Sequence, residues 1–129
     1  MVNLNLEGAL TFFYYHDLDE TATFYEDVMG FEKMMDTGWV KIYRIKDGAH
    51  LGLVNAERGS HKPSRVKPVR LQVMVEDADA WFQHLKDKGV ELDREAPHVG
   101  KELNIKAFSV KDPGGYTVEL CEYTSPYGV

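Results

Sequence analysis

The feature that most constrains the fold of this 129-residue chain is an order of predicted elements that occurs twice. Each half has a short run of β-branched and aromatic residues, then a helix, then three more strand-like runs separated by turn residues. A helix-capping aspartate is available in both halves, Asp17 or Asp19 in the first and Asp77 or Asp79 in the second. The first half is predicted to contain strands at 9–15, 31–36, 39–45 and 50–55 and a helix at about 20–29, and the second to contain strands at 69–75, 90–93, 103–110 and 116–123 and a helix that ends at Gly89. The sequence therefore predicts two copies of a βαβββ unit.

The boundaries of these two modules follow from a polar stretch in the middle of the chain. Residues 56–67, AERGSHKPSRVK, contain Gly59 and Pro63 and no apolar periodicity, which is typical of a linker. The first module is predicted at 8–55 and the second at 68–125. Together they are expected to form one domain, 1–129, with a mixed α+β architecture.

Composition and charge exclude several classes of function. The formal net charge is -6 and lysine and arginine are not clustered, whereas nucleic-acid binding needs concentrated positive charge. No apolar run approaches the ~20 residues of a membrane span, and the N-terminus lacks the pattern of a signal peptide, so a cytoplasmic protein is expected. The one cysteine, Cys121, excludes an intrachain disulfide and a metal site with several thiolates.

The stretch with the most chemical information is DPGGYTVELCEY, at residues 112–123. Its first part is turn chemistry and its second part predicts a strand. Alternation along that strand places Glu119 on the same face as Thr117 and Cys121, opposite the apolar Val118 and Leu120. Glu119 is therefore expected to point away from the packed face of its sheet.

The internal repeat identifies the residues that correspond to Glu119. Superposing the two capping aspartates pairs Leu10 with Arg70, and superposing the glycines before the last strand of each module pairs Gly52 with Glu119. If the two sheets curve around a shared cavity, these four positions face one another. Arg70 and Glu119 are then expected to form a buried ion pair, which either has a structural role or orients a polar ligand.

Three segments carry a resemblance to a known family. DLDETATFYEDVMGF at 17–31, VEDADAWFQHLKDKGV at 75–90 and DPGGYTVEL at 112–120 together resemble the vicinal oxygen chelate superfamily. This superfamily groups glyoxalase I, extradiol dioxygenases, fosfomycin resistance enzymes and the bleomycin resistance proteins. The resemblance covers nearly the whole chain. It implies two βαβββ modules whose curved mixed sheets enclose a cavity, usually in a homodimer.

The resemblance also implies where a metal would be held. Enzymes of the family bind a divalent metal with His, Glu or Gln, and the metal chelates two oxygens of the substrate. Those positions fall here on Leu10, Gly52, Arg70 and Glu119. An aliphatic side chain, a glycine and a guanidinium do not ligate a metal. We therefore expect no metal at the usual site and no other cofactor.

The expected function follows from the loss of three ligand positions on a retained scaffold. The chain is predicted to be a metal-independent binder of an aromatic or antibiotic-like molecule in a dimeric cavity, similar to the bleomycin resistance proteins. The expected ligand-binding residues are Phe12, Tyr14, Trp39, Tyr43, His50, Arg70, Tyr116 and Glu119. Aromatic residues at strand spacing more often belong to a core, and the polar groups of Tyr14 and Trp39 make these two the preferred pocket residues. The expected partners are a small molecule and a second copy of the chain, with neither nucleic acid nor a membrane.

Two other functions stay open at this point. The chain is alternatively a lyase, isomerase or dioxygenase, either with a displaced metal site built on Glu119 and His50 with help from His16 or His98, or with Glu119 as the catalytic general base. In the metal-free form of that alternative, Arg70 stabilises an oxyanion. The remaining possibility is a structural or regulatory module whose cavity is filled by its own side chains.

Overall fold

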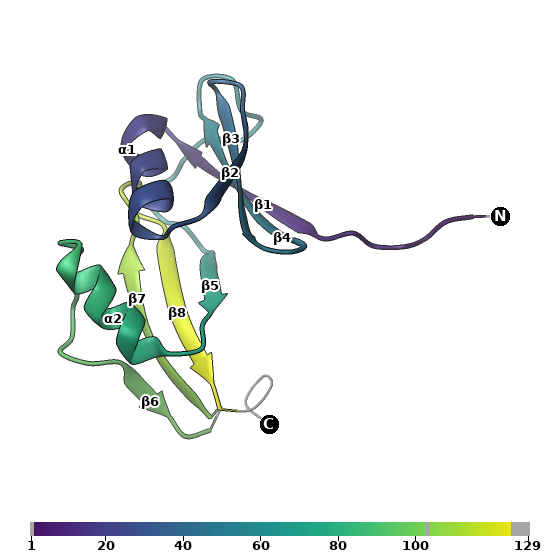
Figure 1. Cartoon of the computed structure of the whole chain (residues 1–129). Coiled ribbons are helices and arrows are strands. Elements are labelled where there is room, and N and C mark those ends of the chain that lie inside the picture. Colours follow the sequence, from purple (N-terminus) through teal and green to yellow (C-terminus); the bar gives the residue numbers. More distant parts are fainter. Residues whose placement is uncertain (1, 103, 125–129) are drawn as a thin grey trace. The chain divides into compact units, whose positions relative to one another are not determined.

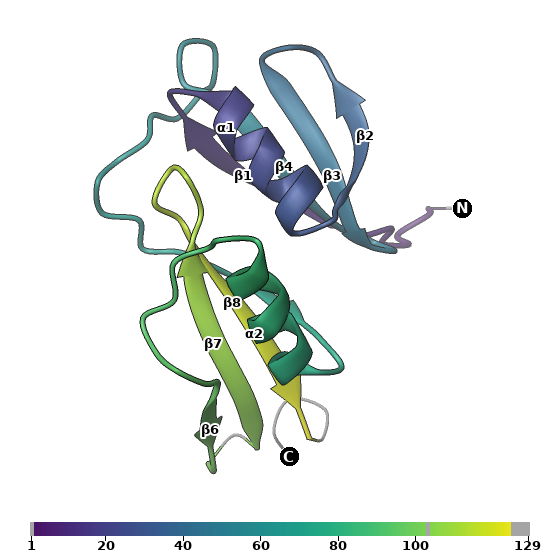
Figure 2. The same cartoon turned by 60° about the vertical axis from the view of Figure 1, so that its left-hand side comes forward.

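The computed structural model describes residues 2–102 and 104–124. The chain divides into two compact units, Met1–Ser64 and Arg65–Val129. Each unit contains a four-stranded mixed sheet with helical segments on one face, and Figures 1 and 2 show both. Each is described by itself.

The first unit contains the elements β1 (Ala9–Tyr15), α1 (Leu18–Thr23), a π-helical turn η1 (Phe24–Val28), β2 (Glu32–Asp36), β3 (Val40–Lys46) and β4 (Ala49–Asn55). The strand order is β1-β4-β3-β2, in which β1 and β4 run parallel and the other pairs are antiparallel. The helical segments connect β1 to β2, as Figure 1 shows. This is the βαβββ order that the sequence predicts.

The second unit repeats this arrangement with β5 (Arg70–Met74), α2 (Ala78–Asp87), β6 (His98–Gly100), β7 (Ile105–Lys111) and β8 (Thr117–Tyr123). The strand order β5-β8-β7-β6 matches that of the first unit, and β5 and β8 are again parallel. The predicted fold class is therefore confirmed.

The core of each unit lies between the sheet and its helix. In the first unit, alternate residues of β1 and β4 are buried on the helix side, namely Phe13, Tyr15, Leu51 and Leu53. In the second unit, Val118 and Leu120 of β8 and Leu85 of α2 are buried in the same way. The residues between them point to the other face of each sheet, which is called the open face below.

Some predicted elements differ from the structure. The first helix begins at Leu18, because Asp17 caps it by accepting from the backbone N of Asp19 at 2.9 Å, and it widens into the π turn before Met29. No strand forms at 90–93. The backbone N of Val90 instead donates to the carbonyl of Leu85 at 3.0 Å, which closes the end of α2, and β6 lies further along the chain. The predicted strand at 103–110 begins at Ile105, and residue 103 lies outside the described residues.

The turn before β8 fixes the direction in which Glu119 points. Asp112 Oδ1 accepts from the backbone N of Gly114 and from that of Tyr116, each at 2.9 Å. Gly115 has a φ of 90°, which a residue with a Cβ rarely adopts. The turn therefore holds Asp112 in a buried position and begins the alternation of β8 at Thr117. None of the helices among residues 2–102 and 104–124 is long and apolar enough to cross a membrane.

Candidate functional site

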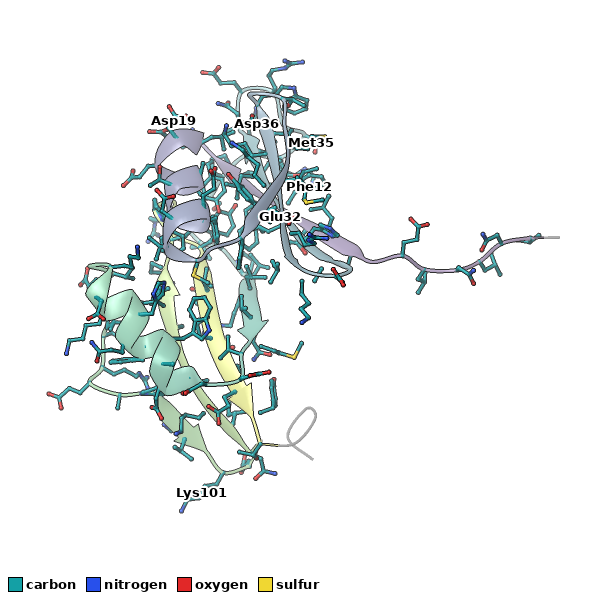
Figure 3. All side chains as sticks on the ribbon, viewed as in Figure 1. Phe12, Asp19, Glu32, Met35, Asp36 and Lys101 are labelled. Carbon is teal, nitrogen blue, oxygen red and sulfur yellow. The ribbon has the colours of Figure 1, made fainter. Side chains whose placement is uncertain are left out.

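The open face of the first unit is mainly apolar. The register of β1 and β4 places Leu10 beside His50 and Phe12 beside Gly52. Phe12 is 42% exposed, and Figure 3 shows it on the side of the sheet away from α1. Met35 of β2 belongs to the same row across the sheet, because it lies opposite Ile42, which lies opposite Gly52.

The ring of Phe12 lies directly over Gly52. A Cβ atom at position 52 would lie 2.5 Å from Phe12 Cδ1 and 2.7 Å from Phe12 Cε1. Real Cβ contacts are not this short, so the missing side chain at position 52 makes room for the ring. The surface of β4 at this point is consequently covered by an aromatic ring.

A loop after β4 covers the far end of the same face. The rings of Tyr14 and His61 stack with their centroids 5.2 Å apart, and Gly59 packs closely against Tyr14 and Val54. The guanidinium of Arg58 lies 4.6 Å from the centre of the Trp39 ring. The linker predicted from composition is thus folded onto the sheet in its first part. The contacts of Arg58 and His61 were not predictable, because both residues lie in a polar stretch without periodicity.

The open face of the second unit is polar around Glu119. Gln72 Nε2 donates to Glu119 Oε1 at 3.0 Å, and Arg70 Nη1 lies 3.6 Å from the same oxygen. Tyr123 OH in turn donates to Gln72 Oε1 at 2.9 Å. The side chain of Glu119 is 14% exposed, and its second oxygen, Oε2, accepts from neither Gln72 nor Arg70.

The ion pair between Arg70 and Glu119 differs from the expected buried pair. The side chain of Arg70 is 56% exposed, because β5 forms an edge of its sheet and the guanidinium reaches along the surface. An ion pair of this kind contributes little to stability. The residue that holds Glu119 is Gln72, the neighbour of Glu119 in the register of β5 and β8. The internal repeat could have indicated this contact, because it pairs Gln72 with Phe12 and Glu119 with Gly52.

Two of the predicted site residues lie away from both open faces. Tyr43 points to the helix side of the first sheet, where it is fully buried, and its hydroxyl donates to Glu26 Oε2 at 2.6 Å. Burial, together with the bond to Glu26, raises the pKa of Tyr43 far above its usual value. Tyr116 is buried at the turn before β8, with Lys67 Nζ 5.0 Å from its ring centre. Both tyrosines have packing roles in this structure.

The residues at the family's metal positions do not fit a metal. Leu10 and Gly52 offer no ligand atom, and the space above Gly52 contains the Phe12 ring. Arg70 is a cation, so Glu119 is the one anionic donor of the four. Within residues 2–102 and 104–124, no three or more His, Cys, Asp or Glu side chains form a group that could hold a metal ion. His50 lies in a row of β1, β4 and β3 residues, between Leu10 and Arg44.

Comparison with known proteins identifies the same superfamily that the sequence resembles. A family model described as Glyoxalase/Bleomycin resistance protein/Dioxygenase superfamily matches residues 9–120. The uncharacterized protein YraH of Bacillus subtilis (strain 168) is 25% identical over 115 residues, which cover 81% of this chain and 89% of that protein.

Solved structures share the same architecture. Lactoylglutathione lyase from Agrobacterium tumefaciens has a TM-score of 0.75 at 20% identity, with 93% of this chain and 96% of that chain covered. Virulence protein STM3117 from Salmonella typhimurium has a TM-score of 0.72 at 17% identity, with 96% of this chain and 100% of that chain covered. Identities this low show a common fold and nothing of the ligand.

Proposed function

We propose that this chain, which belongs to the Glyoxalase/Bleomycin resistance protein/Dioxygenase superfamily, binds an apolar or aromatic small molecule. The proposed binding protein is a homodimer and uses no metal. The observation that carries the proposal is the Phe12 ring over Gly52. The Phe12 ring occupies the space where the family has a metal-ligating side chain, on the face that the family uses for its substrate. Apolar and aromatic walls with a few placed polar groups are what small-molecule sites usually contain.

Each open face, taken by itself, offers different contacts. On the first unit, the rings of Phe12 and Tyr14 provide flat apolar surface, and the loop contact of His61 holds Tyr14 in place. On the second unit, Glu119 Oε2 and the guanidinium of Arg70 provide an acceptor and a donor group. The first face therefore favours an aromatic ligand, and the second favours a polar group.

The experiment combines a metal measurement with a binding measurement. Protein purified without chelators is expected to contain far less than one metal ion per chain by plasma mass spectrometry. Binding of the aromatic dye 8-anilinonaphthalene-1-sulfonate, followed by fluorescence, is expected to weaken about tenfold in Phe12→Ala, because removal of a partly buried aromatic side chain loses roughly 1.4 kcal/mol of contact. Val99→Ala, which removes an exposed apolar side chain in β6, is the matched control and should bind normally. A stoichiometric, tightly bound metal, or equal binding by both variants, would contradict the proposal.

A second function is favoured by the geometry of Glu119. One carboxylate oxygen is fixed by Gln72 and Arg70 while the other accepts from neither, which is the arrangement of a positioned base. In this alternative, Glu119 removes a proton next to a carbonyl group of the ligand and Arg70 stabilises the resulting oxyanion.

The two functions are separated by Glu119→Gln. The amide keeps the shape of the side chain but does not accept a proton, so a catalytic role predicts at least a 100-fold loss of proton exchange between bound ligand and deuterated solvent, with affinity retained. The matched control is Glu122→Gln, whose carboxylate accepts from the backbone N of Ala78 on the helix side at 2.9 Å. Weakened affinity without any exchange in the wild type supports the binding function.

A further inference from the structure

The outer edge of β7 is covered along only part of its length. β6 is three residues long, and its pairing with β7 ends at His98 and Ala107. Figure 2 shows β6 beside the beginning of β7 only. The sequence predicts a further strand at 90–93, and the structure has none there. Residues 108–111 of β7 therefore have no strand on this side within residues 2–102 and 104–124, and they are called the free edge below.

The turn after β7 determines which backbone groups of the free edge point outward. The backbone N of Asp112 donates to the carbonyl of Tyr116 at 2.9 Å, so these two residues form a hydrogen-bonded pair across the hairpin. Bonded and non-bonded pairs alternate along an antiparallel ladder, so Ser109 and Lys111 turn their N–H and carbonyl groups away from β8. The described residues, 2–102 and 104–124, contain no hydrogen-bond partner for these outward groups. The free edge therefore offers backbone donors and acceptors at strand spacing.

A cavity of about 510 Å³ lies along the free edge. Its walls are Glu91 and Asp93 of the segment after α2 and the consecutive residues 109–112. Successive residues of a strand point to opposite faces, so a cavity lined by consecutive residues lies beside the backbone and not on one face of the sheet. It is therefore a different surface from the open face around Glu119. Its volume falls within the roughly 300–1,000 Å³ that is usual for ligand sites.

The side chains at the free edge do not protect it in the usual way. Edge strands are commonly protected by charged side chains, above all lysine. Here Lys111 Nζ donates to Thr117 Oγ1 of β8, so the ammonium group is turned across the sheet and away from the edge. Ser109, the other residue whose backbone groups point outward, has a small side chain that is only partly exposed. Both residues thus leave their backbone groups open to the cavity.

We propose that the free edge binds an extended peptide segment that carries lysine or arginine, and that this segment adds to the second sheet as a further strand. The backbone of such a segment matches the donors and acceptors of the edge. Glu91, Asp93 and Asp112 line the cavity, against the positive charges of Lys111 and of Arg94, whose Nε lies 3.7 Å from Asp93 Oδ1. The site is therefore negative overall and favours a cationic side chain. This interaction goes beyond the small-molecule binding proposed above.

Two other occupants fit the free edge less well. A second copy that paired its own free edge there would bring Glu91 and Asp93 of both copies together, and like charges at close range repel. The segment 91–93 of the same chain lies at the cavity wall, but these described residues make no backbone hydrogen bond to β7. Both alternatives predict that the amides of the edge are already protected in the free protein.

Amide hydrogen exchange, followed by NMR, tests the edge itself. In the free protein, the amides of Ser109 and Lys111 are expected to exchange fast, whereas those of Phe108 and Val110 point to β8 and are expected to be protected. Equal protection of all four amides would overturn the proposal, because another segment or a second copy would then cover the edge.

Fluorescence anisotropy with labelled peptides tests the partner. The peptide acetyl-Val-Lys-Thr-Lys-Val-Lys-Thr-amide is expected to bind, and to slow the exchange of the Ser109 and Lys111 amides. Two further peptides should each bind at least about tenfold more weakly. One has glutamate in place of lysine and loses the charge complementarity, and the other has methylated backbone nitrogens and loses the donors. Equal binding by either of them, or no binding of the lysine peptide at about 1 mM, is incompatible with an added basic strand.

Charge-removing variants test the cavity wall. Glu91→Gln combined with Asp93→Asn is expected to weaken binding of the lysine peptide about fivefold at low ionic strength, because exposed ion pairs are individually weak. Glu95→Gln is the matched control, since it removes an exposed carboxylate from the same loop outside this cavity and should leave the affinity unchanged. All three side chains are exposed, so both variants should keep the circular dichroism spectrum of the wild type. An equal effect of the two variants would refute the role of the cavity wall in selecting a cationic segment.

Discussion

Replacing Gly52 by alanine is expected to change stability in opposite directions with and without the Phe12 ring. A methyl group at position 52 would lie 2.5 Å from Phe12 Cδ1, whereas an ordinary carbon contact is about 3.5–4.0 Å. The ring must therefore move by about 1 Å or swing away from β4, and overpacking of this kind costs about 1–3 kcal/mol. Because the ring is 42% exposed and can move toward solvent, the lower end of that range applies.

The sign reverses once the ring is removed. In a Phe12→Ala background the nearest remaining atom is Leu10 Cδ1, at an ordinary contact distance of 3.5 Å. Alanine is then favoured over glycine in a strand by about 0.5–1 kcal/mol, so the coupling between positions 12 and 52 should be about 1.5–2 kcal/mol.

Urea unfolding of the four proteins of this cycle, followed by circular dichroism at one temperature, measures the coupling. Leu10→Ala provides the matched control, because Leu10 makes only an ordinary contact with position 52 and should show no coupling with Gly52→Ala. If Gly52→Ala changes the free energy of unfolding equally, within about 0.5 kcal/mol, with and without the Phe12 ring, the ring does not lie over Gly52.

Three further predictions concern ionisable side chains. A hydrogen bond from Lys41 lowers the pKa of Asp36 to about 2 from 3.8, so the stability that its carboxylate contributes is present above pH 3.8 and is lost as the pH falls through about 2. Carboxyl NMR should give this value and Lys41→Met should raise it; an unshifted wild-type titration contradicts the contact. Burial raises the pKa of the Cys121 thiol, so a disulfide reagent at pH 8 should label it only as the protein unfolds, and immediate labelling contradicts its burial. Burial and the bond to Glu26 raise the pKa of Tyr43, so an ultraviolet titration should show this phenol ionising at a higher pH than a free phenol, and Tyr43→Phe should lower the free energy of unfolding by about 1 kcal/mol.

Much of the fold is predictable because it depends on local patterns. Asp17 and Asp77 cap their helices as short-range capping rules predict, and the alternation along β8 places Glu119 opposite the buried Val118 and Leu120. The repeated βαβββ order follows from these local signals. The missing strand at 90–93 shows their limit, since an apolar residue after a helix also serves to close the end of that helix.

The site was less predictable because it depends on the register of strands far apart in the chain. The contact of Phe12 with Gly52 and that of Gln72 with Glu119 both require the pairing of the first and last strands of a unit, which no local pattern contains. The exposure of Arg70 follows from its place on an edge strand. Tyr43 shows a related ambiguity, because an aromatic residue on a strand is equally suited to either face of the sheet.

The pairing of Phe12 with Gly52 also affects what position 52 can hold. The equivalent pair in the second unit is Gln72 and Glu119, so the same backbone arrangement holds a large and an empty position in one unit and two polar side chains of similar size in the other. A carboxylate at position 52 would displace the Phe12 ring, so it is accommodated at lower cost once residue 12 is smaller. The free-energy cost of restoring a metal ligand at position 52 therefore depends on the residue at position 12.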